Sequence, residues 1–304
     1  MMWGRSPGRV SLALPVHNGE RFLAECVESL LAQTYDDFEL VIADNASTDA
    51  TEQISREFAT RDPRVRYIRR ETNIGAVRNH NLLVRETAGD LFMWAGADDV
   101  HDPRRLAHLI DALDAHAGAV LAFTASREIN GAGKTISTWH NDCRIDDPDP
   151  MVRMGDLIRR TLDPSKFFYG VIRRSALERT QLVSPVQYSD GILSAELSLL
   201  GPFVEVDEEL LGHRKRDDPA TDPTAREWYQ QQRAVPVFFL PIAAEGVWYF
   251  RAIWGLPLSR KVRLRALWAA RPWLRRQAIP IARNVARALI SIGEEVVQNM
   301  RSRR

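Results

Sequence analysis

Strand-like and helix-like segments alternate over the first 125 residues, and this alternation limits the possible folds more than any other feature of the sequence. Five runs have the apolar composition of buried strands, namely residues 10–14, 38–43, 65–68, 91–94 and 120–124. The segments between them are predicted helices, at residues 20–33, 51–59, 76–87 and 103–115. Such alternation predicts parallel strands joined by right-handed crossovers. We therefore expect an α/β fold with a mostly parallel central sheet and flanking helices.

Composition excludes several classes of protein. Of the 304 residues, 45% are apolar and 27% are charged, which is ordinary for a globular protein and unlike a disordered or fibrous chain. Cys26 and Cys143 are too few for a disulfide framework or a four-cysteine zinc site. The longest apolar stretch, 234–244, contains two prolines and is too short to span a membrane. With no secretory signal at the start of the chain, we expect a cytoplasmic protein.

The near-neutral net charge hides an asymmetry. Residues 246–304 carry 13 Lys and Arg against 2 Glu, whereas the first 245 residues carry 28 basic and 38 acidic side chains. The basic segment also contains four of the eight tryptophans, and Pro257, Pro272 and Pro280 divide it into short predicted helices. We therefore predict two domains, a main domain at 1–225 and a basic, tryptophan-rich helical extension at 226–304.

The composition of this extension predicts a partner. Cationic helices with tryptophan anchors are typical of anionic membrane surfaces, so we expect residues 246–304 to hold the protein at the inner face of the plasma membrane. A helical cap on the acidic body and an oligomer contact are alternatives. Nucleic acid is a third, but we do not expect it as a partner.

Two motifs that resemble phosphate-binding loops do not fit their context. Residues 131–135 read GAGKT, but the earlier glycine of a P-loop is replaced by Glu128 and the following residues are β-like rather than helical. They predict a hairpin turn around Asn130-Gly131. Residues 15–20, after the first strand, contain no G-x-G-x-x-G, which argues against a dinucleotide-binding dehydrogenase.

Polar residues follow the predicted strands, where parallel sheets bind their ligands. Adjacent carboxylates such as Asp98 and Asp99 repel each other unless a cation lies between them, and a divalent metal there can bridge phosphate oxygens. The Asp44 carboxylate can accept an N–H of a nucleobase, and Arg78 can donate to phosphate. The structural alternatives are helix caps for the three aspartates, a solvated helix face for Arg78, and a capping or packing role for His17.

Four ordered motifs resemble glycosyltransferase family 2 with the GT-A fold. They are LPVHNGE at 14–20, LVIADNASTD at 40–49, NIGAVRN at 73–79, and ADD at 97–99 followed by Pro103 and Leu106. The resemblance is strong over residues 10–124 and weaker to Arg216. Members of this family transfer a sugar from a nucleotide-diphosphate-sugar donor, usually with inversion at the anomeric carbon and with Mg²⁺ or Mn²⁺.

The resemblance implies roles for individual residues. Asp44 would read the base, Arg78 would lie near the base and phosphates, Asp98 would contact the ribose or sugar, and Asp99 would bind the metal. Ala97 replaces an acidic residue that many members carry. The implied substrate-binding set is Pro15, Val16, His17, Asn18, Glu20, Asp44, Asn45, Ser47, Arg78, Asn79 and Asp98.

The second half of the domain supplies the expected general base. Asp190 precedes a predicted helix at 191–200, as the acidic base does in the family, and Glu196 is the second candidate. Relatives often carry a histidine near the phosphates, and that position aligns with Arg216, so His213 is interpreted as displaced.

These expectations combine into an inverting transferase that moves a sugar from a nucleotide-sugar donor to an acceptor hydroxyl in cell-envelope or polysaccharide synthesis. The acceptor is expected to be a glycan or a lipid-linked sugar. Uracil is the expected base, although thymine and guanine also present an N–H to Asp44. The alternatives are a nucleotidyltransferase, which normally has a basic glycine-rich loop after the first strand, and a non-catalytic nucleotide-sugar-binding protein.

Overall fold

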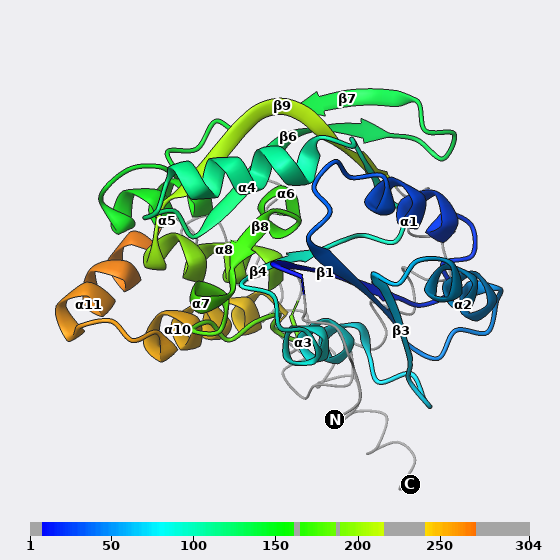
Figure 1. The fold of residues 1–304 in the computed structure, drawn as a ribbon. Helices are drawn as coiled ribbons and strands as arrows, with labels where there is room; N and C mark the ends of the chain where they lie inside the picture. Colours follow the sequence, from blue (N-terminus) through cyan, green and yellow to red (C-terminus); the bar gives the residue numbers. More distant parts are fainter. Residues whose placement is uncertain (1–7, 161–164, 187–188, 216–240, 272–304) are drawn as a thin grey trace, which may run out of the picture.

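A computed structural model describes residues 8–160, 165–186, 189–215 and 241–271 (Figure 1). It has a nine-stranded mixed sheet with the order β3-β2-β1-β4-β8-β6-β9-β5, and β7 pairs with β6. Helices cover both faces of this sheet. The predicted α/β class with a central sheet and flanking helices is confirmed.

The first half of the sheet is parallel, as the alternation predicts. It consists of β1 (Val10–Val16), β2 (Phe38–Asp44), β3 (Val65–Arg69) and β4 (Leu91–Trp94). Alternate residues of β1 enter different cores, Leu12 and Leu14 on one face and Ala13 on the other. A strand buried on both faces explains the continuous apolar runs of the sequence.

The connecting helices divide between the two faces. The first core joins one face to α1 (Leu23–Leu31), α2 (Thr51–Arg61) and α4 (Arg105–Ala115), and the second joins the other face to α3 (Ala76–Glu86). Helix α1 begins at Leu23 rather than at residue 20, because residues 17–20 form a loop that bonds to the chain after β2.

The second half of the sheet contains antiparallel pairs that the alternation does not predict. Strand β8 (Val171–Arg173) lies between β4 and β6 (Leu121–Ile129) and is antiparallel to both. Strand β9 (Phe203–Arg214) runs parallel to β6 and then pairs antiparallel with β5 (Val100–His101). The end of β9 is thereby brought beside the residues that follow β4.

The predicted strand over 167–172 is wrong in its first half. Residues Ser165–Phe168 form a helical turn, α6, and only Val171–Arg173 are extended. Adjacent side chains of a strand point to opposite faces, yet Phe167 and Phe168 are both buried in the same core. The helical turn allows both rings to pack there, Phe168 stacked on Trp94 with centroids 4.6 Å apart.

The GAGKT motif forms a hairpin turn, as predicted. It connects β6 to β7 (Thr135–Trp139), and the Asn130 N–H donates to the Lys134 carbonyl at 2.9 Å. Gly133 has φ +75°, a conformation that favours glycine.

The described part of the extension is helical. Helices α10 (Pro241–Gly255) and α11 (Arg260–Ala269) pack on α5 (Pro150–Arg160) and α8 (Ser189–Leu200) through a third apolar core. Figure 1 shows them at the end of the molecule opposite α2, with the short α7 (Arg174–Leu177) nearby. Among the described residues, no helix has the length and apolarity needed to cross a bilayer. The predicted boundary at 225/226 and residues 272–304 lie outside the described residues.

Candidate active site

The parallel strands β1, β2 and β4 end at one edge of the sheet, and most of the predicted site residues follow them there. Val16 at the end of β1 pairs with Asp44 at the end of β2. Val16 is buried in the first core, and its carbonyl accepts the Asn45 N–H at 2.8 Å. Pro15 is half-buried. This edge therefore combines backbone at the tip of β1 with side chains from the neighbouring loops.

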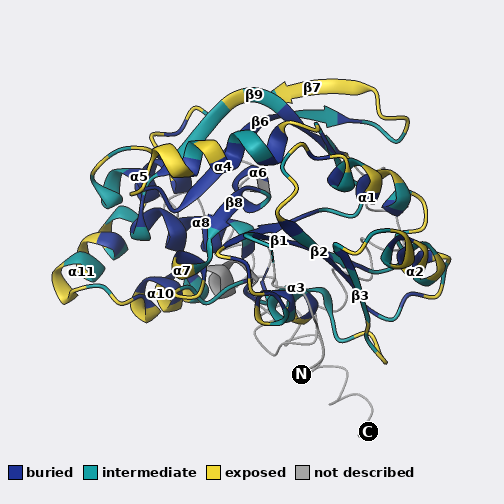
Figure 2. Cartoon of the chain, in the orientation of Figure 1, coloured by how far each residue is buried: buried dark blue, intermediate teal, exposed yellow. Residues whose placement is uncertain are grey.

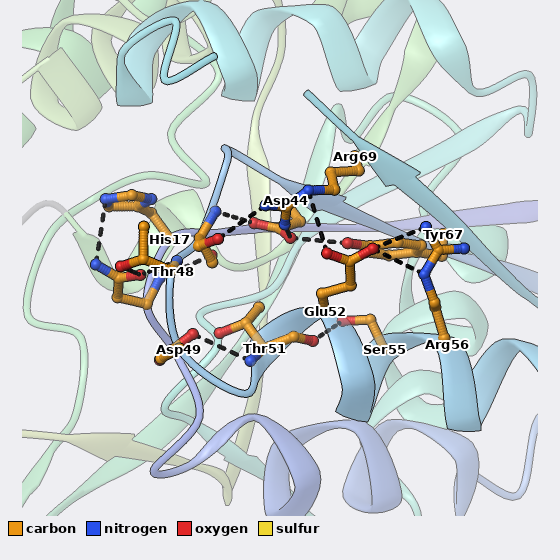
Figure 3. Close-up of polar contacts among 12 residues, drawn as sticks. His17, Asp44, Thr48, Asp49, Thr51, Glu52, Ser55, Arg56, Tyr67 and Arg69 are labelled. Carbon is orange, nitrogen blue, oxygen red and sulfur yellow. Dashed lines mark hydrogen bonds and ion pairs between the residues drawn. The ribbon is translucent and has the colours of Figure 1, made fainter. Parts of the chain in front are cut away.

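Asp44 is the most enclosed of these groups, with no exposed surface. Its Oδ1 accepts the Ser47 N–H at 2.8 Å, and its Oδ2 accepts the Tyr67 hydroxyl at 2.7 Å and Arg69 Nη1 at 2.6 Å. Arg69 also reaches Glu52 at 3.3 Å (Figure 3). A carboxylate has about four acceptor positions, and three of them are occupied here.

Sequence reasoning missed Tyr67 and Arg69, although a signal was present. They are two residues apart on β3, which places them on one face, and the β2–β3 register pairs Ile42 with Tyr67 and Asp44 with Arg69. Burial, followed by the hydrogen bond to Asp44, raises the pKa of Tyr67 to about 12. Tyr67 therefore keeps its proton and donates a hydrogen bond to Asp44 over the whole physiological pH range.

The loop after β1 is clamped to the loop after β2. The Asn18 N–H donates to Ser47 Oγ at 2.9 Å, and Asn18 Oδ1 accepts the Thr48 N–H at 2.9 Å. Glu20 Oε2 accepts the Ala50 N–H at 2.9 Å, directly before α2. The predicted residues Asn18, Glu20 and Ser47 thus hold the shape of the two loops.

The loop after β3 joins the same group. Asn45 donates to Asn73 Oδ1 at 2.8 Å and accepts the Ile74 N–H at 2.9 Å. Asn79 is buried and donates to the Ala43 carbonyl at 2.8 Å. The Nε2 atom of His17 lies 3.3 Å from Asn73 Nδ2. Three of the motifs therefore meet in one hydrogen-bonded unit.

Arg78 differs from its neighbours in this unit. It lies in the first turn of α3, is exposed, and forms no hydrogen bond or ion pair with any residue in the described ranges. Its guanidinium remains available to an anionic group.

The Asp98-Asp99 turn follows β4. The Asp99 carboxylate is buried, and its Oδ1 accepts the Arg214 N–H at 3.0 Å and lies 3.1 Å from His213 Nδ1. Burial alone raises the pKa of Asp99, but the charge and hydrogen bond of His213 and the Arg214 N–H outweigh it and hold the pKa below its usual value. Asp99 is therefore charged at neutral pH.

Arg214 organises this turn. Its guanidinium is buried and donates to the carbonyls of Asp98 (2.7 Å), Asn130 (2.9 Å) and Gly131 (3.2 Å), and to Glu25 Oε2 (2.7 Å). One side chain thus ties the Asp98-Asp99 turn to α1, to the β6–β7 hairpin and to the end of β9.

From the sequence, His213 is displaced from the position at which relatives carry a histidine near the phosphates. The structure places His213 beside Asp99. The β5–β9 pairing, in which Val100 faces Gly212, determines this position. The pairing is formed across more than 100 residues, so no local sequence signal reveals it. Arg216, the aligned position, lies outside the described residues.

The loop after β1 also connects Asp44 to the Asp98-Asp99 turn. A Cβ built on Gly19 would lie 3.9 Å from the Ala97 Cβ and 2.5 Å from Val16 Cγ2. Glycine is therefore needed for the tight packing of the loop against Val16, and Ala97 lies next to the loop. The nucleotide-binding residues predicted from the first three motifs and the acidic pair of the fourth form one continuous edge.

Asp190 lies in the first turn of α8, which confirms the predicted helix. The end of α8 leads into β9, whose first residue pairs with Leu121 at the start of β6. The last residues of α8 therefore lie near the start of β6. Asp190 lies at the other end of this helix, which is about 18 Å long for its 12 residues.

Glu196 has different surroundings. It is buried two turns into α8, and both of its oxygens lie within 3.3 Å of the Gln181 N–H that they accept. Burial raises its pKa to about 8. These contacts indicate a carboxyl group that holds the chain before α8.

The donors at the acidic turn suit a divalent cation. Asp98 and Asp99 offer carboxylate oxygen atoms, and Mg²⁺ sites commonly use one or two carboxylates together with substrate phosphates. Within the described ranges, no three His, Cys, Asp or Glu side chains form a complete metal site. A cation held here would therefore take its remaining ligands from a phosphate-bearing substrate and water.

Comparison with known proteins agrees with this arrangement. The model of glycosyl transferase family 2 matches residues 11–179. The putative glycosyltransferase EpsE of Bacillus subtilis (strain 168) is 35% identical over 109 residues, which cover 36% of this chain and 39% of EpsE. The chain thus matches less than half of the length of this relative.

Two solved structures share the fold at 16% sequence identity. TarS of S. aureus, residues 1–349, in complex with UDP-GlcNAc aligns with a TM-score of 0.63 over 87% of this chain and 72% of TarS. The mannosyltransferase PcManGT from Pyrobaculum calidifontis, in complex with GDP-Man and Mn²⁺, aligns with a TM-score of 0.53 over 98% of this chain and 84% of PcManGT. The predicted GT-A fold is confirmed. Because the family model covers more than half of its residues, the chain belongs to glycosyl transferase family 2.

Proposed function

We propose that this chain transfers a sugar from a nucleotide-diphosphate-sugar donor to an acceptor hydroxyl, with inversion at the anomeric carbon. One observation carries the proposal: the buried Asp99 carboxylate, paired with His213, lies on the same loop edge as the enclosed Asp44. A nucleoside diphosphate has a polar base at one end and a charged diphosphate at the other. The two carboxylates suit these two ends.

The Asp44 end is proposed to hold the base. One acceptor position of Asp44 remains, and the Arg69 side chain, 33% exposed, has to move aside for a base N–H to reach it. We propose uracil and hence a UDP-sugar donor. The TarS and PcManGT complexes contain different bases, so GDP-sugars belong in the same test.

The Asp99 end is proposed to hold the diphosphate. Asp99 would hold a Mg²⁺ or Mn²⁺ ion, Asp98 would contact the ribose or sugar, and Arg78 would be a further cation for the phosphates. Such an ion, when bound, neutralises charge on a departing diphosphate. The role of Arg214 is to keep the Asp98-Asp99 turn in place through its bonds to the Asp98 carbonyl and to Asp99.

Asp190 is proposed as the general base. It accepts the proton of the acceptor hydroxyl while that oxygen bonds to the anomeric carbon and the bond from this carbon to the diphosphate oxygen breaks. The products are the glycosylated acceptor and the nucleoside diphosphate. Attack opposite the leaving group inverts the configuration, so a base at the acceptor side is required.

The acceptor is proposed to be a glycan or lipid-linked sugar of the cell envelope or of a polysaccharide. We place the reaction on the cytoplasmic side, because nucleotide sugars are made there.

A donor screen followed by one substitution tests the proposal. The wild-type chain is first assayed with UDP- and GDP-sugars and Mn²⁺, both for thermal stabilisation and for nucleoside diphosphate release. With the active donor, Asp190→Asn should lower kcat by about 10²–10⁴-fold and leave the donor KM nearly unchanged. The matched control is Asp111→Asn, an exposed aspartate on α4, which should behave as wild type. A fully active Asp190→Asn variant would remove Asp190 from the mechanism, and stabilisation by no nucleotide would remove the donor class.

A further inference from the structure

Helices α10 and α11 carry most of the large apolar side chains that are exposed in the described part of the chain. Six large apolar side chains are exposed in the described ranges, and five of them lie on these two helices at 48–66% exposure: Val247, Phe250, Trp254, Leu264 and Trp268. Their spacings of three or four residues place them along one side of each helix. Figure 2 shows exposed residues along the outer sides of both helices. We call these five residues the α10–α11 apolar face.

The opposite sides of the same helices are already packed. Tyr249 and Ile253 of α10, Leu256 directly after it, and Ala266 of α11 are buried in the third core against α5 and α8. The two helices thus cover α5 and α8, as in the helical cap that the sequence left as an alternative. This packing explains only the apolar residues on their inner sides. The apolar face points outward because the inner side is fixed.

Cations surround the apolar face. Residues 246–271 contain six Arg and Lys and no Asp or Glu. Three arginines lie over tryptophan rings, Arg251 over Trp248 at 4.6 Å, Arg263 over Trp254 at 5.5 Å and Arg271 over Trp268 at 4.2 Å. Stacking of this kind keeps each charge beside an apolar ring.

We propose that the α10–α11 apolar face docks the protein on an anionic lipid surface. Aromatic and aliphatic side chains of such helices enter the boundary between headgroups and acyl chains, while neighbouring cations bind anionic headgroups. Arg265 pairs with Asp149 at 2.9 Å, and the other five cations leave the surface positively charged. A symmetric contact between two copies would bring two such surfaces together, which is unfavourable. Nucleic acid would leave Val247 and Leu264 without an apolar partner.

Docking at this face would fix the orientation of the site. Helix α10 packs on α8, and α8 carries Asp190 in its first turn. The proposed base would therefore be held at a constant height above the lipid surface. The docking itself does not depend on the proposed reaction, and its test uses no activity.

Vesicle flotation with the full-length chain tests the proposal. Wild type should float with phosphatidylcholine vesicles that contain phosphatidylglycerol and much less with phosphatidylcholine alone. The Trp254→Ser/Trp268→Ser double variant should partition about tenfold less into the anionic vesicles. Ile136→Ser is the matched control, because Ile136 is the sixth exposed apolar residue and lies on β7, so this variant should float as wild type. Wild-type levels of binding by the double variant, or no binding by wild type, would overturn the proposal.

Three further measurements identify other occupants. The double variant should lose only a few degrees of Tm, because the two rings are 48% and 66% exposed and each has one stacked arginine. A much larger loss would show that the chain itself covers the face. A wild-type dimer that the double variant dissociates would show a self-contact. RNA binding that the double variant loses, together with no flotation of wild type, would show a nucleic-acid site. Each of these results contradicts lipid docking. Should the double variant not fold, Arg260→Glu/Lys261→Glu, at two exposed cations, should lower binding to anionic vesicles by about tenfold.

Discussion

Asp44 and Asp99 are both buried carboxylates at the ends of parallel strands, but the chain holds them in different ways. The partners of Asp44 come from the loop directly after it and from the neighbouring strand, with Arg69 only 25 residues away. The partners of Asp99 come from β9, 114 and 115 residues later in the chain. The Asp44 end of the site is therefore local, whereas the Asp99 end exists only after the whole sheet has formed.

The largest expected effect is at the Asp99 end. Asp99→Asn keeps the size of the side chain and removes the charge that His213 and a cation need, so kcat/KM for transfer should fall by about 10³-fold. Added Mn²⁺ should not restore it. Steady-state kinetics over a range of Mn²⁺ concentrations measure this, and a variant that reaches wild-type kcat at high Mn²⁺ would contradict the assignment.

The same difference explains how much the sequence predicts. The strands and helices of the first 125 residues, and the motif residues at their ends, follow from local patterns and were found. Tyr67 and Arg69 lie beside Asp44 because of the β2–β3 register, and their two-residue spacing on β3 is the sequence signal that places them on one face. The positions of His213 and Arg214 depend on the pairing of β9 with β5. The start of β8 depends on the packing of Phe167 and Phe168 into one core. No local sequence pattern encodes the pairing or the packing.

A second expected effect concerns the long-range connections of Arg214. Arg214→Ala removes a buried guanidinium that bonds to four residues, so the free energy of unfolding should fall by about 2–3 kcal/mol. Urea unfolding measures this. The control is Arg56→Ala, an exposed arginine on α2 paired with Glu52, which should change little. Equal stability of both variants would show that Arg214 is not the organiser of the turn.

Glu196 is a third buried carboxyl group, and it differs from Asp99 in that no positive charge contributes to its pKa. Its pKa of about 8 exceeds the ordinary value of 4.5, so the folded state retains a proton that the unfolded state loses. Stability should therefore fall as the pH rises from about 4.5 to 8, by a few kcal/mol in total. Glu196→Gln should flatten this dependence in urea unfolding at several pH values. An unchanged pH slope in the variant would contradict the burial argument.

The smallest expected effect is at the Asp44 end. Tyr67→Phe removes one of three hydrogen bonds to Asp44 and leaves Arg69 in place, so the donor KM should rise only about threefold to tenfold while kcat stays constant. A large loss of kcat would show that this end of the site takes part in the chemical step.

The central claim is that Asp44 and Asp99 hold opposite ends of one nucleoside diphosphate. Calorimetric titration of the matching nucleoside diphosphate, with and without Mn²⁺, into wild type, Asp44→Asn and Asp99→Asn tests it most directly. Mn²⁺ should tighten binding by about tenfold in wild type and in Asp44→Asn, which binds weakly throughout, and should have no effect in Asp99→Asn. Equal tightening by Mn²⁺ in Asp99→Asn and wild type would contradict the account.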